Sequence, residues 1–151
     1  LERLQNLVWL NDPDEDRLDA LARALANRVD KYFPDGTPAV KITLPTPVPD
    51  DAIRGLWRRE LMAWLDECLA NIAKHSGASH VRLTIEVDGA EVGIEVHDDG
   101  IGIVPGKVRE GSRGLANLRS RIADLGGRVE IHSELGRGTR VSARIPRRSM
   151  G

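Results

Sequence analysis

One predicted helix carries a group of polar residues whose types could bind a metal ion and phosphates. In the segment E-C-L-A-N-I-A-K-H, helical geometry places Glu67, Asn71 and Lys74 on one flank, roughly 100–160° from the apolar line, with His75 at the border. Carboxylate and amide oxygens suit Mg²⁺, and a lysine or histidine can meet phosphate oxygens. Polar residues on a helix flank are commonly only solvated, so this helix alone leaves both interpretations open.

A second candidate group follows a predicted strand, in the segment D-D-G-I-G. The carboxylate of Asp98 could accept a hydrogen bond from an exocyclic amine such as that of adenine. Gly100 and Gly102 lack a Cβ atom, so the backbone there can approach a ligand closely. The same sequence is also common in ordinary turns, and by itself it does not distinguish a turn from a site.

The segment 103–114 is rich in glycine and contains three cations, which is typical of a functional lid or of disorder. We expect Gly114 to open the next helix, where free backbone N–H groups can bind an anion. Lys107, Arg109 or Arg113 could then close over phosphates, although each could equally be a solvated loop residue. In the segment G-R-G-T, Thr139 is first in its strand and could offer a hydroxyl group.

Five short runs must position these residues, and each alternates apolar and polar residues with period two. Such alternation predicts strands with one buried face and one wet face. The runs are Val40–Leu44, Val81–Val87, Val92–Val96, Val129–Ile131 and Val141–Ile145. Asp88-Gly89 between the second and third runs indicates a hairpin turn.

Three segments have apolar residues at helical spacing, namely 14–31, 50–75 and 113–125. Five one-sided strands need one apolar cover, and three amphipathic helices can supply it. The sequence therefore predicts a two-layer α/β (α+β) sandwich, in which three helices cover one face of a mixed five-stranded sheet.

Composition narrows the class of protein. The chain of 151 residues has 22 Lys+Arg against 23 Asp+Glu, so no charge bias indicates nucleic acid or lipid as a partner. Cys68 is the only cysteine, which excludes an internal disulfide and favours an intracellular, cytoplasmic location. No run approaches the roughly 20 apolar residues that a membrane span needs.

The four segments in this order resemble the ATP-binding catalytic domain of the GHKL superfamily, in particular that of two-component sensor histidine kinases. Glu67 to His75 resembles the N box, Asp98 to Gly102 the G1 box, Gly111 to Leu115 the G2 box, and Gly136 to Thr139 the last glycine-rich box. The segments N-I-A-K-H-S-G-A-S and G-L-A-N-L-R-S-R-I-A-D-L-G-G are similar to the branch that signals to LuxR/NarL-type response regulators.

The resemblance implies the Bergerat fold, ATP and Mg²⁺ as ligands, and a role for each matching residue. Asn71 would coordinate the Mg²⁺, and Glu67 would position or polarise the reacting groups. Lys74 and His75 would contact phosphates, and Asp98 would bind the adenine amine. The remaining implied contacts are lid hinges and ligand contacts at Gly100, Gly102, Arg113, Gly114, Leu115 and Thr139.

The resemblance also implies partners. We expect residues 1–13 to be the end of a linker or dimerisation helix and 14–151 to be the catalytic domain. The acceptor would be a histidine on a dimerisation domain outside this chain, in a homodimeric parent protein that could be membrane-anchored. The strand histidines His80, His97 and His132 are interpreted as surface or packing residues. A serine kinase of the anti-sigma-factor type and a non-catalytic nucleotide-binding module are the alternatives.

Overall fold

The computed structural model describes residues 16–103 and 108–151, and within 108–113 it describes the backbone only. The helices and strands follow in the order α2 (Leu18–Tyr32), β1 (Ala39–Thr43), α3 (Gly55–Asn71), β2 (His80–Val87), β3 (Glu91–Asp98), α4 (Val108–Asp124), β4 (Arg128–Glu134) and β5 (Gly138–Pro146). A π-helical turn, Ile72–Ser76, continues α3, and a 3-10 turn, Arg147–Ser149, follows β5.

The strands of the described chain form one mixed sheet in the order β1-β2-β3-β5-β4. β1 runs parallel to β2, and the other neighbours are antiparallel. The predicted hairpin at Asp88-Gly89 joins β2 to β3, where the Asp88 carboxylate accepts hydrogen bonds from the N–H groups of Ala90 and Glu91. The predicted mixed five-stranded sheet is confirmed.

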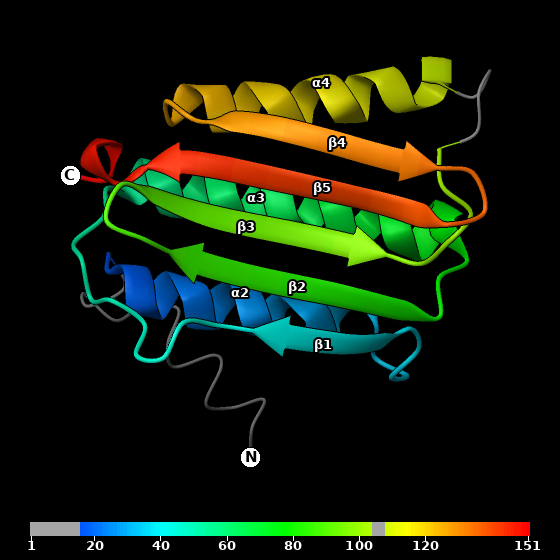
Figure 1. Ribbon diagram of the computed structural model, residues 1–151, viewed down its shortest axis with the longest axis horizontal. Coiled ribbons are helices and arrows are strands. Elements are labelled where there is room, and N and C mark those ends of the chain that lie inside the picture. Colours follow the sequence, from blue (N-terminus) through cyan, green and yellow to red (C-terminus); the bar gives the residue numbers. More distant parts are fainter. Residues whose placement is uncertain (1–15, 104–107) are drawn as a thin grey trace.

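The three α-helices of the described residues lie against one face of the sheet, and the other face is uncovered (Figure 1). The core fills the space between these two layers. It joins the inward residues of β2, β3 and β5 to the apolar faces of α2 and α3, including the fully buried Trp57 and Trp64. Period-two burial in β2 and β3 produces this arrangement, and the predicted two-layer sandwich is confirmed.

Two helix boundaries and the burial of one strand residue differ from the prediction. α3 begins at Gly55 and not near residue 50, because residues 51–53 are extended: Leu18 N–H donates to Asp51 O, and Ile53 N–H donates to Asp16 O. α4 begins at Val108, five residues before the predicted start. In β1, Ile42 is 38% exposed, because β1 is an edge strand that the helices cover incompletely.

The predicted linker segment, residues 1–13, lies outside the described residues. Among the helices that the structure describes, none combines the length and the apolar character needed to cross a membrane.

Candidate functional site

A cavity of about 300 Å³ opens at the end of the sheet where β3 terminates. Its walls come from α3 and its π-helical turn, from β3 and the loop after it, from α4, and from β5. This volume lies at the lower end of the range for small-molecule sites, about 300–1,000 Å³. The lining includes eight of the residues that the sequence analysis selected: Glu67, Asn71, His75, Asp98, Gly102, Gly114, Leu115 and Thr139.

The helix side of the cavity is formed by Glu67, Asn71 and His75, one turn after another. The predicted polar flank is therefore present, but Lys74 is exposed and is not among the lining residues. Cys68 also lines the cavity. Burial raises the pKa of its thiol well above the ordinary value, so the group stays neutral and packs as an apolar residue.

Asp98 is the most buried carboxylate of the site, with 6% of its surface exposed. The backbone N–H of Gly100 donates to Asp98 Oδ1 at 2.9 Å, which fixes the carboxylate in the cavity wall. Burial raises the pKa of Asp98 above the ordinary aspartate value, and this effect outweighs the opposing hydrogen bond from Gly100. The result is a fixed, poorly solvated acceptor, which suits recognition of a ligand N–H group.

Ser76 joins the two halves of the site, and the sequence analysis did not select it. Its hydroxyl donates to Ile72 O at 2.9 Å and accepts from Ala78 N–H at 3.1 Å. Its carbonyl oxygen accepts from Ile101 N–H at 2.8 Å. The end of the helix that carries Asn71 is thus bonded directly to the loop that follows Asp98.

Gly100 packs directly against this junction. A Cβ atom at Gly100 would overlap the carbonyl oxygen of Ser76 and lie 2.7 Å from Ser76 Cβ. The sequence feature that could have indicated Ser76 is its position just before a glycine, Gly77. In the structure, Gly77 has a φ of +60° and ends the helical turn in the left-handed conformation. Gly100, the first glycine of the D-D-G-I-G segment, is therefore needed because any larger residue would clash with Ser76.

The start of the predicted lid is bonded to the turn between β4 and β5. Ile103 N–H donates to Ser133 Oγ at 2.7 Å, and Gly136 N–H donates to Ile101 O at 2.9 Å. Gly102 has a φ of +78°, and a Cβ there would lie 2.6 Å from Glu134 O. The hydroxyl of Thr139, at the cavity wall, is 2.9 Å from Ser133 Oγ.

On the opposite wall, Gly114 of α4 lies against Glu67 of α3. A Cβ atom there would lie 2.8 Å from Glu67 Oε1, so the absence of a side chain leaves room for the Glu67 carboxylate. The prediction that Gly114 opens the helix is wrong, since α4 starts at Val108 and Gly114 lies inside it. The side chains of Arg109 and Arg113, and all of Lys107, are outside the described part of the chain.

The donor set limits which metal the cavity could hold. Within 16–103 and 108–151, no group of three or more histidine, cysteine or acidic side chains is placed to hold a metal ion. Mg²⁺ in nucleotide sites takes only one or two protein oxygens, because phosphates and water supply the others. The oxygens of Asn71 and Glu67 at one wall therefore fit a Mg²⁺ that arrives with a nucleotide better than a structural ion held by protein alone.

The part of the chain that forms the cavity is similar to known proteins. Residues 58–149 match the family model of the histidine kinase-, DNA gyrase B-, and HSP90-like ATPases. The chain is 29% identical over 99 residues to the sensor histidine kinase LiaS of Bacillus subtilis, covering 66% of this chain and 28% of the relative. It is 35% identical over 101 residues to the signal transduction histidine-protein kinase/phosphatase UhpB of Salmonella typhimurium, covering 67% of this chain and 20% of that protein.

The fold agrees with a solved structure. The histidine kinase domain of the blue-light activated histidine kinase EL346 from Erythrobacter litoralis aligns with a TM-score of 0.67 at 24% identity, covering 83% of this chain and 60% of that chain. The matched region contains the helix and strand ends that build the cavity. The chain corresponds to less than a third of the length of the curated relatives LiaS and UhpB.

Proposed function

Because this chain belongs to the family of histidine kinase-, DNA gyrase B-, and HSP90-like ATPases, we propose that its cavity binds Mg-ATP and that it is the catalytic domain of a sensor histidine kinase. The observation that carries the proposal is the meeting of Glu67, Asn71 and Asp98 in one cavity. These residues come from a helix and a strand end about thirty positions apart, and each faces the same space.

The two ends of the cavity have different tasks. The buried carboxylate of Asp98 accepts a hydrogen bond from the adenine amine, and the bond from Gly100 N–H holds it in position. The wall formed by Glu67, Asn71 and His75 faces the phosphates in this proposal, and Lys74 and Arg113 are further candidate phosphate contacts. Gly102 hinges the lid, and Gly114, Leu115 and Thr139 complete the ligand contacts.

Phosphoryl transfer requires mainly positioning and charge neutralisation. A Mg²⁺ bound to the nucleotide supplies the neutralisation, and Asn71 with its neighbour Glu67 would hold it. Glu67 positions or polarises the reacting groups next to the acceptor. Gly114 supports this role, because its missing Cβ leaves space for the Glu67 carboxylate between α3 and α4.

The phosphoryl acceptor in this proposal is a histidine of a dimerisation domain in the same parent protein, which is a homodimer. The phosphoryl group then passes to an aspartate of a LuxR/NarL-type response regulator in the cytoplasm. The similarity to LiaS and UhpB supports a histidine kinase over the other ATPases of the family.

Nucleotide binding to three variants tests the site. Asp98→Ala should weaken ADP and ATP alike, by roughly ten- to a hundredfold, since a charge-assisted hydrogen bond to a buried carboxylate is lost. Asn71→Ala should mainly remove the dependence of ATP binding on Mg²⁺. Calorimetric titration with and without Mg²⁺ measures both effects.

Asp35→Ala is the control, because Asp35 is exposed in a turn and does not line the cavity. Its affinity for both nucleotides should equal that of the unmodified chain. Unaltered binding in Asp98→Ala and Asn71→Ala would contradict the assignment of the site.

A second measurement concerns the acceptor. The isolated chain should bind ATP but show little or no autophosphorylation, because the proposed acceptor histidine belongs to another domain. Incubation with γ-labelled ATP, followed by acid treatment, measures any acid-labile phosphohistidine. Labelling of a histidine within this chain would contradict the proposed division between donor and acceptor domains.

A further inference from the structure

The uncovered face of the sheet carries a row of basic residues that crosses all five strands. In the strand register, Lys41 lies opposite Arg82, and Arg82 lies opposite His97. His97 lies opposite Arg140, which in turn lies opposite His132. We call Lys41, Arg82, His97, Arg140 and His132 the basic row.

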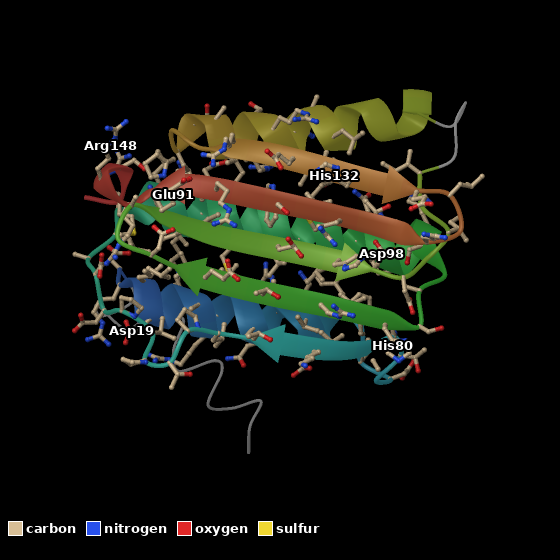
Figure 2. The ribbon with its side chains drawn as sticks, viewed as in Figure 1. Asp19, His80, Glu91, Asp98, His132 and Arg148 are labelled. Atoms are coloured by element: carbon tan, nitrogen blue, oxygen red, sulfur yellow. The ribbon has the colours of Figure 1, made fainter. Side chains whose placement is uncertain are left out.

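The basic row points away from the helices. Its members alternate with residues that face the core, such as Val81, Val96 and Val141, and successive side chains of a strand point to opposite faces. The view in Figure 1 looks onto this uncovered face, and Figure 2 labels His132 there on β4. The nucleotide cavity, by contrast, is lined by inward residues.

His97 and His132 carry a charge only when protonated, and Arg140 and His132 each lie near a glutamate, so Lys41 and Arg82 are the fixed charges of the basic row without an acidic partner among the described residues. Lys41 and Arg82 are exposed, and neither forms an ion pair or hydrogen bond there. Arg140 is 49% exposed, and its Nε is 3.6 Å from Glu95 Oε1. His132 is 70% exposed, with Nε2 3.7 Å from Glu130 Oε2.

The alignment of Lys41 with Arg82 is unfavourable for the isolated sheet, because like charges directly opposite each other on neighbouring strands destabilise a sheet. Other arginines on this face have acidic partners: Arg140 Nε is 3.6 Å from Glu95 Oε1, Arg128 NH1 is 2.9 Å from Glu91 Oε2, and Arg144 NH2 is 3.8 Å from Glu86 Oε2. A local conflict that the fold retains is expected where a surface has a task.

We propose that the basic row binds an acidic ridge on a protein partner, which lies across the strands. Four strand spacings of about 4.8 Å give the row a length of about 19 Å. A helix of roughly three and a half turns has that length and can present one carboxylate per turn along one side. Electrostatic complementarity of this kind mainly sets specificity and association rate.

The surroundings of the row favour a protein ridge over a nucleic acid or a membrane. The adjacent row contains Glu95 and Glu130, and a hollow of about 200 Å³ beside it is lined in part by Glu86 and Glu95. A broad polyanion would also contact these carboxylates and be repelled by them, whereas a narrow acidic ridge contacts only the basic row. The near-neutral net charge of the chain, −1, gives no general attraction for polyanions.

The test uses a synthetic helical peptide with one glutamate per turn on one side, and follows its binding by fluorescence anisotropy at low salt. Arg82→Glu and Arg140→Glu should each weaken binding by at least about tenfold, since an attraction becomes a repulsion. Arg148→Glu is the matched control, because Arg148 is exposed but lies outside the row (Figure 2). It should change the affinity by less than about twofold.

Thermal unfolding separates binding from a structural role. Arg82→Glu should melt at the same temperature as the unmodified chain or higher, because a like-charge contact with Lys41 becomes an opposite-charge contact. Absence of peptide binding, equal weakening by Arg148→Glu, or a lowered melting temperature of Arg82→Glu would each overturn the proposal. Tighter binding of duplex DNA or of phosphatidylserine vesicles than of the peptide would also overturn it, by identifying another class of partner.

Discussion

At the scale of single residues, the shape of the cavity depends on two glycines without a Cβ atom as well as on the polar side chains of its walls. Gly100 and Gly114 are the two positions where a missing Cβ lets the chain pass beside Ser76 and Glu67. Neither contact is visible in the local sequence, since both glycines also fit ordinary turn or helix patterns. The site is therefore sensitive to the smallest possible substitution.

Replacing Gly100 with alanine should cost about 2 kcal/mol or more of unfolding free energy, because the new methyl group overlaps the carbonyl oxygen of Ser76. The same change should weaken ADP binding, since Ser76 and Asp98 are both displaced. Urea denaturation and calorimetry measure the two effects.

Gly89→Ala is the matched control, because no atom lies within 4 Å of a Cβ at that position. It should change stability by less than about 1 kcal/mol. Equal stability of the two variants would show that the backbone near Ser76 yields without cost.

The residues of the site could be predicted in part. Glu67, Asn71 and Asp98 were selected from residue type and from spacing along regular elements, and all three line the cavity. Ser76 was missed, because its role is a tertiary contact with a loop more than twenty residues away. Lys74 was placed on the same flank as Asn71 by ideal α-helical geometry, but the chain winds there as a wider π-helical turn that brings His75 to the cavity instead.

At the scale of elements, the orientation of α3 fixes the direction of Glu67 and Asn71. α3 is tied to α2 by a bidentate pair: Arg28 Nε and NH2 donate to the two carboxylate oxygens of Asp66, each at 2.7 Å. The hydrogen bond from Arg28 is the largest influence on the Asp66 carboxyl group, and the pKa of that group is lowered. Asp66 lies one residue before Glu67, so this pair links α2 to the part of α3 that carries the site residues.

A double-mutant cycle on Arg28 and Asp66 should give a coupling free energy of about 1–2 kcal/mol, since both side chains are partly buried and the geometry is bidentate. Because the pKa of Asp66 is lowered in the fold, this stability is present above the ordinary aspartate pKa and is lost as the pH falls through the lower folded value. Denaturant unfolding at neutral and acid pH measures the coupling.

The cycle on Arg128 and Glu91 is the comparison, because that pair is more exposed. Its coupling should be smaller than that of Arg28 and Asp66, because water screens the exposed Arg128. A larger value for this pair than for Arg28 and Asp66 would contradict the role of the helix–helix pair.

The elements themselves were predicted well, because alternation with period two and apolar stripes at helical spacing are local signals. The predicted ends of the helices and strands were less accurate, because they depend on tertiary contacts. Residues 51–53 have helix-compatible types but pair with the backbone of residues 16–18, a contact that no local pattern reveals. The exposed Ile42 in β1 reflects the position of that strand at the sheet edge, which the sequence does not encode locally.

At the scale of the whole molecule, the proposed nucleotide site predicts that ligand binding and folding are coupled through Asp98. An ADP concentration of about a hundred times Kd should stabilise the folded chain by about 2.7 kcal/mol. For a chain of this size this corresponds to a rise in Tm of roughly 5–10 °C. Thermal unfolding across a series of ADP concentrations measures the rise.

The rise should shrink as the pH falls from neutral towards the raised pKa of Asp98, because the buried carboxylate takes up a proton earlier than an ordinary aspartate. The ligand-free chain behaves in the opposite sense: the buried charge costs stability at neutral pH, and protonation relieves that cost. Asp98→Asn is the control and should show a small shift at both ends of this pH range. A pH-independent shift in the unmodified chain would exclude Asp98 as the acceptor.

The strand order has a consequence for synthesis on the ribosome. β3 pairs early with β2 through a short hairpin, but its other neighbour, β5, comes after α4 and β4 in the chain. Asp98 therefore gains its partner strand, and the cavity its Thr139 wall, only when the last hairpin has emerged and closed. If the proposed site is correct, nucleotide binding therefore requires this long-range pairing, and we expect the ligand to stabilise the completed fold but not a partially synthesised chain.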